Sequence, residues 1–297
     1  MTRNGLPVVV IAAAGCARRF NGEQKVLADV GGMPAVCRVA KACEEGLGPH
    51  RQIVVVGHMA EQVRAALGEA PHREFVHQQP QLGTGHALMV ALAGLNGTHS
   101  SELYFLCGDK PLLTAESVRR LRTKLRTSGA AMVFLTSELD GDPQDSRQGR
   151  VLQAHRGTAR AEVLAIVERA AIDALDGRRL AFESLNGGRC EFTREQLLDV
   201  RDVNVSAYGW RLEALGDHIG EQRQHPESGE YLITDLVEIL RRHRYLVRAF
   251  SVHNGHEGIG IDTHDLLEQA KEAWAELRDT THRAGHSRNG GPLPRAR

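Results

Sequence analysis

Short apolar stretches alternate with amphipathic stretches through the first half of the chain, and this alternation limits the possible folds more than any other feature. The apolar stretches, which are typical of buried strands, lie at 6–12, 52–57, 73–77, 102–107 and 130–136. Stretches with helical spacing lie between them, at 34–45, 60–67, 86–95 and 114–127. The alternation predicts an α/β fold with a doubly wound, parallel sheet. Ligands bind such sheets beyond the C-terminal ends of the strands.

The second half of the chain has a less regular pattern. It predicts strands at 163–167, 203–210 and 246–252 and helices at 231–243 and 263–278. Residues 279–297 show no apolar periodicity and are rich in Gly, Arg, His and Pro, so we expect a disordered tail. His282 and His286 have the spacing of a helical metal-binding pair, but a glycine-rich tail is a poor setting for such a site.

The composition excludes several classes of protein. The 37 basic and 37 acidic residues balance, which argues against a general nucleic-acid or membrane-surface binder. No apolar stretch approaches the roughly 18 residues of a membrane-spanning helix, and no signal-peptide pattern precedes the first strand. The five cysteines form no Cys-x-x-Cys pair. We therefore expect a cytoplasmic protein with reduced thiols, and the sequence leaves its oligomeric state open.

A turn of small residues follows the first predicted strand. Ala13, Ala14 and Gly15 allow a ligand to approach the backbone closely, and consecutive N–H groups in such a turn suit phosphate oxygens. Arg19 and Lys25 follow and would add positive charge for a polyphosphate. The turn matches neither the Walker A nor the Gly-x-Gly-x-x-Gly pattern. Taken alone, it is equally compatible with an ordinary strand-to-loop connection.

A second polar segment, residues 78–87, follows the third predicted strand. The carboxamides of Gln78 and Gln81 can pair with the edge of a nucleobase, while Gly83 and its neighbours permit backbone contacts around Thr84. The segment could equally be a polar turn that precedes the helix at 86–95.

A third motif, residues 106–112, places Asp109 directly after the fourth predicted strand. A carboxylate at this end of the sheet points into the ligand crevice, and beside phosphates its task would be to hold Mg²⁺. Standing alone, Asp109 could also simply cap the following turn.

The three motifs together resemble the sugar-phosphate nucleotidyltransferases, most closely the pyrophosphorylase domain of bacterial N-acetylglucosamine-1-phosphate uridylyltransferases. The family signature Leu-Ala-Ala-Gly-x-Gly-Thr-Arg-Met, with a later Pro-Lys, corresponds to residues 12–20 and 24–25. The family's Gln-Leu-Gly-Thr-Gly-His-Ala motif is matched residue for residue at 81–87, and its Gly-Asp-x-Pro-Leu magnesium motif fits 108–112.

Weaker matches continue in the family's order, at 149–151, 166–168, 203–204, 229–231 and 260–262. By this resemblance Gly149, Glu168 and Asn204 orient the sugar, and Asp262, where the family has Asn, is the second metal ligand. The resemblance spans about 6–277. It implies a Rossmann-like, doubly wound mixed sheet of the nucleotidyltransferase (glycosyltransferase-A-like) type.

The resemblance also implies a domain organisation. A nucleotidyltransferase domain would span 1–278, with a nucleotide-binding part at about 1–137 and a sugar-binding part at about 138–278. The hexapeptide pattern of the family's acetyltransferase β-helix is not found, so we do not expect that second activity.

The implied reaction joins a nucleoside triphosphate and a sugar 1-phosphate. The sugar phosphate attacks the α-phosphorus in line and releases pyrophosphate; the resemblance implies UTP and N-acetylglucosamine 1-phosphate. Mg²⁺ would lie on Asp109 and Asp262, and Arg19 and Lys25 would stabilise the departing pyrophosphate. Such a reaction needs positioning and charge neutralisation more than proton transfer.

Besides Asp262, the chain departs from the family pattern in three places. Residues 17–18 replace Gly-Thr in the phosphate turn, Gln24 replaces the Pro before the lysine, and residues 205–206 replace the Thr-Gly after Asn204. Two alternatives therefore stay open. One is a nucleotidyltransferase that uses CTP or GTP with an alcohol phosphate or a cofactor. The other is a non-catalytic nucleotide-sugar sensor.

Overall fold

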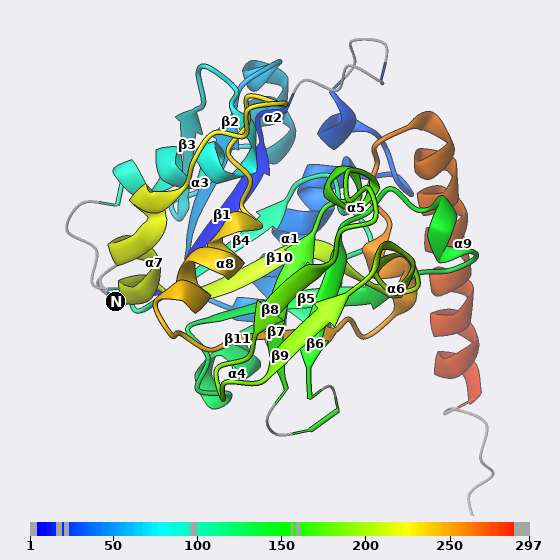
Figure 1. Ribbon diagram of the computed structural model, residues 1–297. Coiled ribbons are helices and arrows are strands. Elements are labelled where there is room, and N and C mark those ends of the chain that lie inside the picture. Colours follow the sequence, from blue (N-terminus) through cyan, green and yellow to red (C-terminus); the bar gives the residue numbers. More distant parts are fainter. Residues whose placement is uncertain are drawn as a thin grey trace, which may run out of the picture.

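The computed structural model describes residues 5–15, 20, 24–95, 100–155, 157–158 and 161–287. Its central sheet is mixed and has the strand order β11-β5-β10-β4-β1-β2-β3 (Figure 1). In that order, the strands are Val247–Ser251, Met132–Glu138, Asp202–Arg211, Glu102–Cys107, Val8–Ala13, Arg51–Val56 and Arg73–His77. Neighbours are parallel except at β10, which is antiparallel to both β4 and β5. The predicted doubly wound mixed sheet is thus confirmed.

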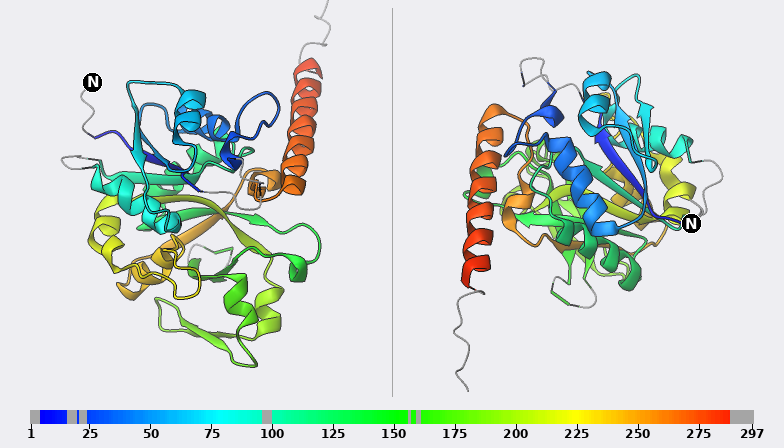
Figure 2. Two further views of the ribbon diagram at one scale, coloured as in Figure 1. Left: turned by 90° about the horizontal axis from the view of Figure 1, so that it is seen from above. Right: turned by 180° about the vertical axis from the view of Figure 1, so that it is seen from behind.

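Helices cover both faces of this sheet (Figure 2). One face is covered by α1 (Ala35–Leu47), α2 (Ala60–Leu67) and α4 (Ala115–Thr127). The other is covered by α3 (Gly83–Ala93), α7 (Leu212–His218) and α8 (Asp235–Arg242). Because side chains alternate along a strand, Val8 and Val10 pack into one core and Val9 and Ile11 into the other. Both faces being buried explains why the strands read as continuous apolar stretches.

A smaller layer grows out of the second half of the chain. β6 (Arg150–Ala154) pairs with β10 and with β7 (Glu162–Val167), and β8 (Leu180–Glu183) forms a separate hairpin with β9 (Arg189–Phe192). Two short helices, α5 (Arg169–Asp173) and α6 (Arg194–Leu198), close a core of their own with these strands. The two predicted parts of the domain therefore share the central sheet through β10 and β11.

Single 3-10 turns connect several elements, and η1, η2, η3 and η4 span Lys25–Leu27, Pro143–Asp145, Ile219–Glu221 and Gly255–Gly258. The last helix, α9, extends from His264 to Ser287 along one edge of the molecule (Figure 2). Its apolar stripe, with Leu267 and Ala270, packs against Phe20 and Val30. No helix in the described ranges is long and apolar enough to cross a membrane.

The last helix corrects one prediction. The closing helix was expected to end at residue 278 and to be followed by a disordered tail, but the helical backbone continues to Ser287. Once a helix is nucleated by packing, each added residue gains a hydrogen bond, so residues without apolar periodicity can extend it. The remainder of the expected tail, 288–297, lies outside the described residues.

Candidate active site

Two adjoining clefts open at the C-terminal ends of β1, β3 and β4. The smaller has a volume of about 560 Å³ and the larger about 1060 Å³. They share Thr84, Cys107, Asp109 and Asp262. Of the predicted site residues, Ala14, Gly15, Lys25, Gln78, Gln81 and Gly83 line the smaller cleft, and Gly149, Glu168 and Asn204 line the larger. The predicted nucleotide and sugar residues thus separate into two clefts that meet at the predicted metal ligands.

A lysine joins two carboxylates where the clefts meet. Lys25 Nζ lies 2.5 Å from Asp109 Oδ2 and 2.7 Å from Asp262 Oδ1. Burial disfavours the ammonium form, but the two carboxylates outweigh this effect and raise the pKa of Lys25 above its usual value. Lys25 thus holds the two carboxylates at one point between the clefts.

The donor set at this point fits Mg²⁺. Asp109 Oδ1 is buried and has no hydrogen-bond partner among the described residues, whereas its Oδ2 is paired with Lys25. Carboxylate oxygens are the ligands that Mg²⁺ prefers, and a buried, unpaired one is costly unless a cation meets it. Asp109 and Asp262 could therefore hold the ion together.

Cys107 also lines both clefts. Burial, and then the nearby Asp109 carboxylate, raises the pKa of Cys107 to about 12. The thiol stays protonated at neutral pH, so the residue is unsuited to act as a nucleophile.

The segment that carries Asp262 is fixed by residues that follow β4. The Ile261 N–H donates to Asp109 O at 3.0 Å, and Lys110 Nζ donates to Gly258 O at 2.9 Å. A Cβ atom at Gly260 would lie 2.7 Å from Lys110 Nζ, so a larger residue here would displace that ammonium group. Lys110 was not predicted as a site residue. The feature of the sequence that could have indicated it is the scarcity of lysine, since the chain has only five.

Glu257 anchors the same segment to α4. The side chain is fully buried, and its carboxylate accepts from Thr114 N and Thr114 Oγ1, from Ser117 Oγ and from Asn254 N, at 2.9–3.0 Å. Thr114 is also the N-cap of α4, as its position in the sequence predicts, and accepts from Ser117 N at 3.2 Å. The segment that carries Asp262 is therefore held on a rigid support.

The 81–87 motif forms the first turn of α3 and does not precede the helix. Gly83 (φ +88°) and Gly85 lie against the backbone of Tyr231, which would meet a Cβ atom at 2.7 and 3.0 Å respectively. Gly85 N donates to Tyr231 O, and Tyr231 N donates to Leu82 O, both at 2.8 Å. This pairing delays the start of α8 to Asp235, four residues after the predicted start of that helix.

The two glutamines have different surroundings. Gln78 is buried, and its Nε2 donates to Gly83 O at 2.9 Å and lies 3.1 Å from His86 Nδ1. Its amide nitrogen therefore holds the loop in place. Gln81 is exposed, and its amide lies over Gly57, where a Cβ atom would be 2.6 Å from Gln81 Nε2.

The small-residue turn after β1 is described as far as Gly15, and Arg19 lies outside the described residues. Ala14 and Gly15 line the smaller cleft, whereas Ala13 is buried in the sheet. Gln24, which replaces the family's proline, is buried and donates through Nε2 to His58 O at 2.8 Å. Gln24 thus ties the start of η1 to the loop that follows β2.

The larger cleft brings Gly149 and Glu168 together. They flank the antiparallel pair β6–β7, so a Cβ atom at Gly149 would be 3.0 Å from Glu168 Oε2. Burial raises the pKa of Glu168, and a hydrogen bond from Thr234 Oγ1, at 3.3 Å, partly opposes this effect. The carboxylate is thus oriented but retains an oxygen that can accept from a ligand.

Asn204 lies in β10 where the pairing with β5 shifts register. Its Nδ2 donates to the Tyr208 hydroxyl, and its Oδ1 accepts from Ser206 N at 2.9 Å. Ser206 has a left-handed backbone (φ +61°). Asn204 is therefore held by its own strand and contributes to the cleft from a β-bulge.

The model of the MobA-like NTP transferase domain family matches residues 9–185, more than half of the chain. The "Bifunctional protein GlmU" of Solibacter usitatus is 34% identical over 280 residues, which cover 93% of this chain and 52% of the relative. That of Streptomyces avermitilis is 33% identical over 265 residues, covering 89% and 49%. The chain spans about half the length of the curated relatives it matches.

Solved structures show the same fold at low sequence identity. A UDP-glucose pyrophosphorylase complexed with UDP-glucose has a TM-score of 0.64 and 12% identity, covering 92% of this chain and 99% of that one. A CMP:2-keto-3-deoxy-manno-octonic acid synthetase complexed with CTP has a TM-score of 0.62 and 17% identity, covering 92% and 100%.

Proposed function

The chain belongs to the family of MobA-like NTP transferase domains, and on this basis we propose that it transfers a nucleoside monophosphate from a nucleoside triphosphate to a sugar 1-phosphate. The observation that carries the proposal is the meeting of two clefts at Lys25, Asp109 and Asp262. A reaction that joins two phosphates needs both substrates to reach one point where negative charge is neutralised.

The smaller cleft would hold the triphosphate. The backbone of Ala14 and Gly15 is open to phosphate oxygens, since no described atom lies within 4 Å of the Cβ position of Gly15. Gln81 is exposed beside this cleft, so its carboxamide would contact the nucleobase. Gln78 instead supports the loop through its hydrogen bond to Gly83. The residue-for-residue match of 81–87 to the motif of the uridylyltransferases supports UTP as the nucleotide.

Mg²⁺ would be held by Asp109 and Asp262, and when bound it would neutralise charge on the α-phosphate. Lys25 would share this work, because its raised pKa keeps it protonated at every physiological pH. The charge that develops on the leaving pyrophosphate would thus face a permanent cation, with Arg19 proposed as a second one from the sequence pattern.

The larger cleft would hold the sugar 1-phosphate, with N-acetylglucosamine 1-phosphate as the proposed substrate. Glu168 can accept a hydrogen bond from a sugar hydroxyl, and Gly149 leaves space above that carboxylate. The side-chain amide of Asn204 already makes hydrogen bonds with Tyr208 and Ser206. We therefore assign Asn204 a role in shaping this cleft as well as in contacting the sugar.

Asp109→Ala tests the proposal. We expect pyrophosphate release to fall about 10³-fold, because a proposed metal ligand and one of the two carboxylate partners of Lys25 are lost. Asp199→Ala is the matched control, since Asp199 is an exposed carboxylate at the end of α6 and should leave the rate unchanged. Undiminished Mg²⁺-dependent turnover by Asp109→Ala would refute the metal assignment.

A substrate panel tests the finer assignments. Pyrophosphate release should be highest with UTP and N-acetylglucosamine 1-phosphate among UTP, CTP, GTP and dTTP and several sugar 1-phosphates. A preference for CTP or GTP with an alcohol phosphate would replace the sugar assignment with the other transferase class. Binding of UTP in a thermal-shift assay without turnover of any acceptor would support a sensor.

A further inference from the structure

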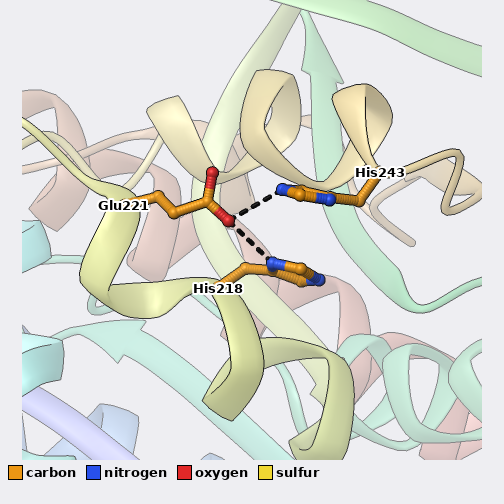
Figure 3. Close-up of side chains that lie close together, drawn as sticks. All are labelled: His218, Glu221 and His243. Atoms are coloured by element: carbon orange, nitrogen blue, oxygen red, sulfur yellow. Dashed lines mark hydrogen bonds and ion pairs between the residues drawn. The ribbon is translucent and has the colours of Figure 1, made fainter.

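Two histidines and a glutamate converge away from both clefts. His218 ends α7, Glu221 ends η3, and His243 directly follows α8 (Figure 3). His218 Nδ1 lies 2.8 Å and His243 Nε2 lies 2.7 Å from the same oxygen, Glu221 Oε1. The three ligand-type atoms all lie within 4.8 Å of one another.

The two imidazole rings are held in a fixed arrangement. They stack with centroids 3.8 Å apart and an interplanar angle of 19°, and Tyr245 contacts the His218 ring edge-on at 5.6 Å. Stacked rings present both nitrogens to one point, as Figure 3 shows.

The carboxylate is oriented from its other side. Arg242 Nη2 lies 3.0 Å from Glu221 Oε2, which leaves Oε1 directed at the two rings. A group that fixes a ligand's orientation from outside is a regular part of metal sites. The His218 side chain is 15% exposed, while Glu221 and His243 are 37% and 40% exposed, so an ion could enter from solvent.

We propose that His218, Glu221 and His243 form a binding site for a divalent transition-metal ion, with Zn²⁺ as the expected ion. Two imidazole nitrogens and one carboxylate oxygen are a regular three-residue zinc set, with solvent as the fourth ligand. In a tetrahedral Zn²⁺ site neighbouring ligand atoms lie about 3.3 Å apart, so each ring would withdraw about 0.5 Å from Glu221 and tilt out of the parallel stack until its nitrogen points at the ion. Mg²⁺ prefers oxygen ligands and should not compete.

A bound ion would connect the two ends of the segment 222–242, which contacts the 81–87 motif of the smaller cleft. Gln222, next to Glu221, donates through Nε2 to Leu232 O at 2.7 Å, and its side chain lies against Gly85. Gly85 N in turn donates to Tyr231 O. Metal binding would therefore stabilise the segment between η3 and α8 that supports the 81–87 motif, and this role does not depend on the identity of the substrates.

Metal titration of the full chain tests the proposal. The background should carry His282→Gln and His286→Gln, so that the C-terminal histidines contribute no site. After removal of metal with a chelator, we expect one equivalent of Co²⁺ to bind and to give the intense visible absorption bands of four-coordinate Co²⁺. One equivalent of Zn²⁺ should displace the Co²⁺, and Zn²⁺ binding should raise the Tm of the protein. Millimolar Mg²⁺ should not displace Co²⁺.

Variants identify the ligands. Glu221→Gln keeps the shape of the side chain and should weaken Zn²⁺ binding at least tenfold, and the double change His218→Gln with His243→Gln should abolish it. His72→Gln is the matched control, because His72 is a partly exposed histidine beside one carboxylate, Glu44. The proposal would be overturned if the background chain bound no Zn²⁺ or if a folded double variant still bound one equivalent. Equally tight Zn²⁺ binding by Glu221→Gln would also overturn it.

Discussion

In the smaller cleft most ligand-facing residues follow directly on parallel strands, whereas in the larger cleft they lie beside antiparallel strands and are held by side-chain hydrogen bonds. Gln78 follows β3 and Asp109 comes two residues after β4. By contrast, Gly149 and Glu168 flank an antiparallel pair, and Asn204 lies within β10 at a shift of register.

This difference has a consequence for how each cleft tolerates change. A residue at a strand end is placed by the backbone ladder, which many hydrogen bonds share. A residue on a loop is placed by a few specific side chains, and the loss of one leaves buried partners unsatisfied. Substitution of supporting side chains should therefore damage the larger cleft and the Asp262 segment most.

The largest effect is expected from Glu257→Ala. Its carboxylate accepts four hydrogen bonds in a fully buried setting, so the substitution leaves four donors without a partner. We expect the free energy of unfolding to fall by about 3–5 kcal/mol, measured by urea denaturation. Glu116→Ala removes an exposed carboxylate from the same end of α4 and should change it by less than about 1 kcal/mol. Equal effects of the two substitutions would contradict the comparison.

The comparison also explains which parts of the structure the sequence could predict. The ends of the strands and helices of the first half were predicted to within three residues, because parallel βα units have a local apolar pattern. In the second half β6, β8 and β9 were not predicted, since short strands in a small layer carry weak periodicity. The early start of α3 at Gly83 depends on Tyr231, which is distant in sequence.

The site shows the same division. Asp109 could be found from its place after a strand. The ion pair that brings Asp262 beside it joins Lys25 and Asp262, which are 237 positions apart. Lys110 occupies a variable position of its motif, and only the fold reveals that it holds Gly258. Motif resemblance supplied Glu168 and Asn204, whereas no local pattern indicated Thr234 or Tyr208 as their partners.

An intermediate effect is expected from Glu168→Gln, which sharpens the contrast between the clefts. Loss of a charged acceptor should raise KM for the sugar phosphate about 10–100-fold, while KM for the nucleotide stays within about twofold. Steady-state kinetics with each substrate varied in turn measures both. A change in KM for the nucleotide as large as that for the sugar phosphate would show that the clefts are not separate in function.

The pH dependence of the same residue has a definite sign. Burial raises the pKa of Glu168 in the folded state, so wild-type KM for the sugar phosphate should rise as pH falls through that pKa, whereas the Gln variant should show a flat profile. The raised pKa also means that Glu168 favours the folded state most below its unfolded pKa, and that this contribution is lost as pH rises through the folded pKa. In Glu168→Gln this contribution is absent, so its free energy of unfolding should not show this decrease as pH rises towards neutrality.

The smallest effect is expected from Ser206→Gly, at the bulge that shapes the larger cleft. A left-handed backbone costs a serine about 1 kcal/mol that glycine avoids, but glycine gives up about 0.4–1 kcal/mol through the greater freedom of the unfolded chain. The hydrogen bond from the N–H of residue 206 to Asn204 Oδ1 is kept in the glycine variant. Ser206→Gly should thus raise the free energy of unfolding by at most about 0.5 kcal/mol.

Ser206→Ala is the control. It keeps the Cβ atom and lacks the hydroxyl beside Tyr208, so it should be less stable than the glycine variant. If the glycine variant is the less stable of the two, backbone conformation does not limit this strand, and its bulge is held by side chains alone.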